Sequence, residues 1–173
     1  MRLLLQRFLD ICLLRAAPQD LPASRVLLLL ALITYCIAGL LLSMINADLS
    51  KALILVAVDV LILAGLMYLL LWIRLLSNRY LQTLTALAGS GAILEFVAWP
   101  VLYWQQLSPV ANGPGLWFAS LLLWLWLFWN IAVVAHILRH TLSTNFFNGA
   151  LLSVIYMFVS VSVIRILFYS SAS

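Results

Sequence analysis

Residues 78–104 read NRYLQTLTALAGSGAILEFVAWPVLYW, and this stretch decides the fold. It is long and apolar enough to cross a bilayer, and Glu95 is the only acid within it. Small side chains fill its middle, and such side chains let neighbouring helices approach closely. The pattern predicts the central helix of a membrane bundle, with a helix-packing face formed by Thr85, Ala88, Gly89, Ser90 and Ala92.

The composition of the whole chain agrees with a membrane environment. Of its 173 residues, 66% are hydrophobic and 8% are charged, whereas a soluble domain carries about 25% charged residues. Such a chain cannot cover a water-facing surface, which excludes a large soluble domain. The net charge of +4 is scattered between apolar runs, so the sequence does not predict a nucleic-acid-binding patch. We therefore expect an all-α, polytopic membrane helix bundle.

Five apolar runs are long enough to span a hydrocarbon core about 30 Å thick. Helices are expected, because backbone groups in lipid must be satisfied within the segment. The predicted spans are residues 25–46, 52–75, 80–104, 116–138 and 146–169, which together form a transmembrane domain over residues 25–170. Residues 105–115 are the longest predicted loop, and the chain ends in the polar tail SSAS.

Residues 1–24 form a separate N-terminal segment, cytoplasmic or interfacial. Apolar and polar residues alternate at helical spacing over its first 16 positions, which predicts an amphipathic helix lying in the membrane interface. The alternative is a short soluble helix packed under the bundle. Pro18 and Pro22 then turn the chain toward the first span.

The basic residues indicate an orientation. If the N-terminus is cytoplasmic, that side holds Arg2, Arg7, Arg15, Arg25, Arg74, Arg79 and Arg139. The other side holds Lys51 and Arg165. The positive-inside rule then places the N-terminus in the cytoplasm and the C-terminus outside, and we expect the membrane to be a bacterial inner membrane.

Three ionisable residues fall inside predicted spans: Asp59, Glu95 and Arg165. The two acids lie at similar depths in the outer half of the bundle, and the long side chain of Arg165, nearer the outer end, can reach toward them, so a buried charge cluster is possible. A lone charge at the bilayer centre costs at least about 2.5 kcal/mol, which favours pairing. One hypothesis is a proton, ion or head-group pathway. The alternatives are a salt bridge that orders three spans, or an Arg165 that snorkels outward and leaves one acid protonated.

The Gly89-Ser90-Gly91 segment resembles the setting of an intramembrane serine protease. Such a protease needs a histidine at the depth of the serine, but His136 and His140 lie near the inner end of the fourth span. We therefore interpret the segment as a packing motif and expect neither catalytic residues nor an enzyme. The two histidines share a helix face, but no third ligand is evident, so no metal or other cofactor is expected.

The fourth span is rich in tryptophan. Trp124, Trp126 and Trp129, followed by Asn130, lie deeper than an interfacial aromatic belt. Buried indoles need a hydrogen-bond acceptor. These residues pack between helices, face a partner protein, or line a lipid or quinone groove.

Several features resemble the Yip family of five-span membrane proteins, named for interaction with small Rab-type GTPases, and especially its small bacterial branch. The features are an N-terminal Leu14-Arg15-Ala16-Ala17-Pro18 element, a third span entered through Arg79, Tyr80, Gln82 and Thr83 and carrying Pro100, and a polar link over residues 140–145. The resemblance implies a five-helix bundle without an established activity. The long cytoplasmic N-terminus of eukaryotic members is missing, so GTPase binding is not expected.

Two functions follow from these observations. The first is a non-enzymatic partner-binding, assembly or membrane-organising component that contacts membrane lipid and another membrane protein or itself, but no nucleic acid. The alternative is a small transporter or lipid-handling protein that uses Asp59, Glu95 and Arg165. A polar cavity that reaches these residues favours the alternative, whereas a dry and fully paired contact favours the first function.

Overall fold

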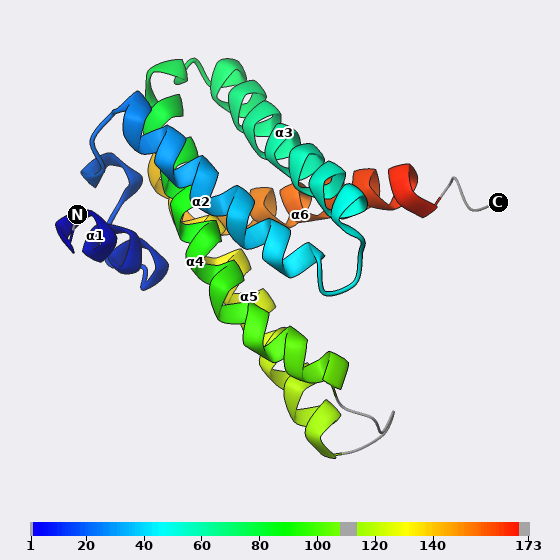
Figure 1. The fold of residues 1–173 in the computed structure, drawn as a ribbon. Helices are drawn as coiled ribbons and strands as arrows, with labels where there is room; N and C mark the ends of the chain where they lie inside the picture. Colours follow the sequence, from blue (N-terminus) through cyan, green and yellow to red (C-terminus); the bar gives the residue numbers. More distant parts are fainter. Residues whose placement is uncertain (1, 108–113, 170–173) are drawn as a thin grey trace.

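The computed structural model describes residues 2–107 and 114–169 (Figure 1). Within these ranges the chain is helical and contains no strand. The α-helices are α1 (Arg2–Cys12), α2 (Arg25–Ser43), α3 (Leu49–Ile73), α4 (Tyr80–Leu107), α5 (Pro114–Leu142) and α6 (Phe146–Tyr169), with short 3-10 turns η1 (Pro18–Asp20) and η2 (Ser77–Arg79).

Five helices of the described part, α2 to α6, are long and apolar enough to cross a membrane. The predicted all-α bundle of five spanning helices with an additional N-terminal helix is therefore confirmed, and the chain is a multi-pass membrane protein. Residues 108–113 of the predicted loop and the whole predicted tail, residues 170–173, lie outside the described residues.

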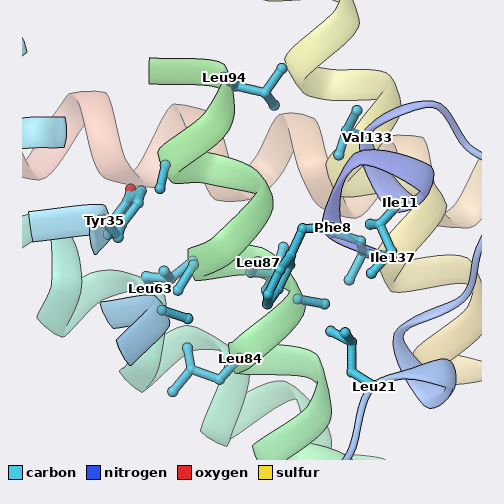
Figure 2. Close-up of a cluster of buried hydrophobic side chains, with 14 of the residues drawn as sticks. Phe8, Ile11, Leu21, Tyr35, Leu63, Leu84, Leu87, Leu94, Val133 and Ile137 are labelled. Atoms are coloured by element: carbon cyan, nitrogen blue, oxygen red, sulfur yellow. The ribbon is translucent and has the colours of Figure 1, made fainter. Parts of the chain in front are cut away.

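Helix α4 lies at the centre of the bundle. Half of its most apolar stretch is buried inside the protein, compared with 28% or less for each of the other four spans. Side chains pack against it from opposite sides: Phe8 and Ile11 of α1 on one, Tyr35 and Leu63 of α2 and α3 on the other (Figure 2). Its small residues allow this, because they let several helices approach one axis.

Two glycines of α4 mark the closest approaches. A Cβ added to Gly89 would overlap the ring of Phe8, and a Cβ added to Gly91 would lie 2.8 Å from the ring of Tyr35. Each aromatic ring therefore fills the space that a missing side chain leaves on α4. Alanine, the next larger residue, does not fit at either position unless the ring moves.

Three helices end without glycine at the position where glycine is common. Leu14, Leu75 and Ser143 adopt left-handed backbone conformations, with φ of 61°, 56° and 53°. The amide of the following residue donates to the carbonyl five positions earlier at 2.8–2.9 Å in each case. These are Schellman-type ends, which satisfy the last helical carbonyls and turn the chain sharply.

Helix α1 lies across α4 and α5. Its Phe8, Ile11 and Cys12 are buried against them, whereas Leu5 and Leu9, with Leu13 just after the helix, form an exposed apolar side. Gln6 and Arg7 are exposed on a third side. A helix with one docked, one apolar and one polar side suits the boundary between lipid chains and headgroups better than water.

Candidate functional site

Polar side chains from α2, α3 and α6 meet at Asp59. The Tyr35 hydroxyl of α2 donates a hydrogen bond to one carboxylate oxygen of Asp59, and Ser160 Oγ of α6 donates to the other at 3.1 Å. Asp59 itself comes from the middle of α3. One carboxylate thus joins three spanning helices through two neutral donors.

A second carboxylate reaches the same place from α4. Glu95 lines a cavity of about 140 Å3 together with Tyr35 and Asp59. Gly39 of α2 faces this carboxylate, since a Cβ added there would lie 3.5 Å from Glu95 Oε2. Glu95 Oε2 is buried and has no hydrogen-bond partner among the described residues. The Glu95 carboxylate therefore lies in the bundle with unmet bonding capacity.

The local fold explains why these groups converge. Tyr35 of α2 lies beside Gly91 of α4, and Gly39 of α2 lies beside Glu95 of α4. Each helix therefore advances by four residues from one contact to the next. Residues four apart share one face of a helix, and these two faces run in the same direction. The glycine at each contact makes room for the larger residue on the opposite helix.

Arg165 is not part of this cluster. Its side chain is exposed, and it forms no ion pair with Asp59 or Glu95 in the part of the chain that the structure describes. The neighbouring Ile164 lines the cavity instead. The structure thus brings together two of the three predicted residues and leaves the basic one outside.

This arrangement has a clear electrostatic consequence. Tyr35 and Ser160 supply hydrogen bonds to Asp59 but no positive charge. Two carboxylates that share a small cavity repel one another when both are ionised. A charge without a partner is also costly inside a membrane. The cavity therefore suits a proton, or a small cation, held between the two acids.

The predicted packing motif around Ser90 lies inside the protein. Ser90 Oγ donates to the Ala86 carbonyl of its own helix at 2.7 Å, and Cys12 Sγ of α1 lies 3.8 Å from the Ser90 carbonyl oxygen. No hydrogen bond joins Ser90 to a histidine within the described residues. The remaining members of the predicted helix-packing face, Thr85, Ala88, Gly89 and Ala92, are buried as well.

The two histidines of α5 lie near its C-terminal end. Their ring centroids are 4.6 Å apart, His136 Nε2 lies 3.0 Å from the carbonyl oxygen of Ala16, and His140 Nε2 lies 3.2 Å from Arg139. Over the described ranges, no group of three histidine, cysteine or acidic side chains is placed to hold a metal ion. The contact with Ala16 ties the N-terminal segment to α5.

The tryptophans of α5 have different surroundings. Trp126 Nε1 donates to the Leu94 carbonyl of α4 at 2.8 Å, and Trp129 Nε1 donates to the Cys12 carbonyl of α1 at 3.1 Å. Trp124 is 61% exposed, and Asn130 is partly buried. Two of the three indoles therefore connect helices, and Trp124 faces the surroundings of the protein.

Sequence reasoning missed Tyr35, Ser160 and Gly39. Tyrosine and serine are neutral, so a search for charged residues inside spans passes over them. Tyr35 lies in the middle of an otherwise apolar helix, where a hydroxyl needs a partner. A depth comparison that included hydroxyl groups would have added Tyr35 to the candidates near the level of the two acids.

Comparisons of the chain with family models, curated proteins and solved structures gave no match.

Proposed function

We propose that this protein is a small, non-enzymatic membrane transporter whose acid pair, Asp59 and Glu95, takes up and releases a proton. The observation that carries the proposal is the shared cavity, which Tyr35, Asp59 and Glu95 line together. No basic side chain of the described residues pairs with either acid. A membrane-embedded acid without a cationic partner is a common feature of proton relays.

The geometry gives each residue a role in this proposal. Asp59 is held by Tyr35 and Ser160, so its carboxylate keeps a fixed position. Glu95 Oε2 has no hydrogen-bond donor, so protonation of Glu95 removes a buried charge that nothing else stabilises. Leu42, Ser43 and Leu55 line the cavity toward the C-terminal end of α2 and the N-terminal end of α3. With a cytoplasmic N-terminus, as the basic residues predict, this end faces outside.

A flux measurement tests the proposal. The protein is reconstituted into vesicles that contain a pH-sensitive dye, and a potassium-diffusion potential drives proton movement. We expect wild-type protein to acidify or alkalinise the lumen faster than empty vesicles, and Glu95→Gln and Asp59→Asn to abolish the difference. Asp48→Asn is the matched control, because Asp48 is exposed and precedes α3. Equal proton fluxes for wild type and both cavity variants would contradict the proposal.

A second candidate is a partner-binding or assembly component of the membrane. One observation favours it: only 11% of the most apolar stretch of α3 and 17% of that of α6 are buried within the protein. Such open helices offer wide surfaces to other membrane helices. Native mass spectrometry of protein extracted gently from its own membrane tests this candidate. A stoichiometric second protein supports it, and a chain without any protein partner contradicts it.

A further inference from the structure

We propose that the groove between α1, α4 and α5 binds one acyl chain of an anionic phospholipid, with the headgroup beside the arginines of the N-terminal segment. The groove has a volume of about 600 Å3, which lies within the range of ligand sites. Its lining includes Leu9 of α1 and Leu13 just after it, Val97 and Val101 of α4, and Leu125 and Trp129 of α5.

The chemistry of the lining selects an apolar ligand. The indole N–H groups of Trp126 and Trp129 donate to the carbonyls of Leu94 and Cys12, so neither is free for a ligand. Cys12 Sγ is directed to the Ser90 carbonyl. A ligand that needs hydrogen bonds would lose its bonds to water without replacement, whereas a hydrocarbon chain loses none.

The position of α1 favours a single acyl chain over a neighbouring helix as the ligand of the groove. Phe8 lies over Gly89, and Cys12 contacts the next residue, Ser90, so α1 lies across α4 rather than along it (Figure 1). The hydrogen bond from Trp129 to Cys12 fixes the same crossing on α5. A neighbouring helix that spanned the membrane alongside α4 would collide with α1. The groove extends from Leu9 of α1 to Val101 of α4, which offers a single acyl chain a place that a whole helix cannot take.

The charge of the N-terminal segment selects the headgroup. Arg7 precedes the groove residue Leu9, and Arg15 follows the groove residue Leu13, and both arginine side chains are exposed. Asp10 is the only acid between them. Basic groups on an interfacial helix attract anionic lipid headgroups. The exposed arginines of the N-terminal segment therefore favour an anionic phospholipid over a zwitterionic one.

Native mass spectrometry after release from nanodiscs tests this inference. The discs contain equal amounts of phosphatidylglycerol and phosphatidylcholine with identical palmitoyl and oleoyl chains. We expect wild-type protein to retain one lipid, mostly phosphatidylglycerol. Leu125→Trp fills the groove and should lower the retained fraction by about tenfold, the effect of losing a modest apolar contact. Leu121→Trp is the matched control, because Leu121 is equally exposed on α5, at 62% against 63%, and does not line the groove.

A second pair of variants keeps the test valid if Leu125→Trp or Leu121→Trp fails to fold. Val97→Trp enters the groove from α4, and Phe96→Trp places the same side chain outside it. Joint replacement of Arg7 and Arg15 by glutamine should keep one lipid bound but remove the preference for phosphatidylglycerol. Loss of all lipid from wild type, equal retention by groove and control variants, or retention of a second copy of the chain in place of lipid would each overturn the inference.

Discussion

The Tyr35 hydroxyl donates a hydrogen bond to the Asp59 carboxylate and so joins α2 to α3 at the cavity that Glu95 also lines. The Tyr35 ring packs against Gly91 of α4, where a side chain would leave no room for it. The packing of α2 on the central helix α4 therefore determines where the Tyr35 hydroxyl meets Asp59.

Tyr35→Phe removes the hydroxyl and leaves the ring in place. We expect the free energy of unfolding in mixed micelles to fall by about 1–3 kcal/mol, because Asp59 loses a donor inside the bundle. Tyr68→Phe is the control, since Tyr68 is 56% exposed and meets Tyr80 edge to face. Equal losses from the two variants would show that the bond to Asp59 contributes no stability of its own.

Gly89→Ala should displace α1. The added methyl group would overlap the Phe8 ring, and overpacking of this kind costs about 1–3 kcal/mol. Gly65→Ala is the control, because a Cβ there meets nothing within 4 Å. Phe8→Leu in the Gly89→Ala background should restore part of the lost stability. A fully stable single variant would contradict the close packing of α1 on α4.

Leu75→Gly should stabilise the protein. Leu75 has φ of 56° and is 89% exposed, so its side chain contributes little packing to offset the strained backbone. A left-handed conformation costs a residue with a Cβ about 1–2 kcal/mol, and part of this gain is lost to the greater freedom of glycine in the unfolded chain. We expect a net gain of about 0.5–1 kcal/mol in the unfolding free energy. Leu75→Ala, which keeps the strain, should show no gain.

The pH dependence of Cys12 alkylation reports whether α1 is packed against α4. Burial raises the pKa of the Cys12 thiol from 9.0 to about 11. In a Cys36→Ser background, alkylation should accelerate toward pH 11, and at pH 8 the thiolate fraction should be roughly 100-fold below that of a free thiol. The folded state holds this proton more tightly than the unfolded state, so the contribution of Cys12 to stability falls as the pH rises from 9 toward 11. Rapid alkylation at pH 8 would show that α1 is not docked as described.

The helical part of the fold follows from the sequence because lipid leaves few choices. Apolar runs of this length must satisfy their backbone groups internally, which fixes five helices. The central place of residues 78–104 follows from their small side chains. The ends of the helices were harder to predict: α3 begins at Leu49, with Lys51 in its first turn, whereas the apolar pattern alone placed its start at 52. Helix α4 also continues through Pro100 to Leu107, beyond the predicted end at 104.

The sequence predicted the depth of the site residues in the membrane, but not which residues of each helix face the inside of the bundle. Position along a span estimates how far a residue lies below the surface. It placed Asp59 and Glu95 at similar depths, and Arg165 nearer the outer end with its side chain in reach of them. It does not show which side of a helix faces the bundle. Consecutive residues are turned by about 100°, and so Ile164 lines the cavity while Arg165 is exposed. That rotation depends on how all the helices pack together.

The most direct test of the acid pair is infrared spectroscopy of the purified protein in lipid at neutral pH, read at the band of protonated carboxyl groups. The chain has five acidic residues, and Asp48 is exposed. A proton held between Asp59 and Glu95 predicts one such band in wild type, unaffected in Asp48→Asn. Glu95→Gln should lose it, because the remaining Asp59 is stabilised as a carboxylate by Tyr35 and Ser160. Asp59→Asn should keep it, because Glu95 Oε2 is buried without a donor and its charge would have no partner. A wild-type spectrum without the band, or a band that survives in Glu95→Gln, would contradict a protonated Glu95.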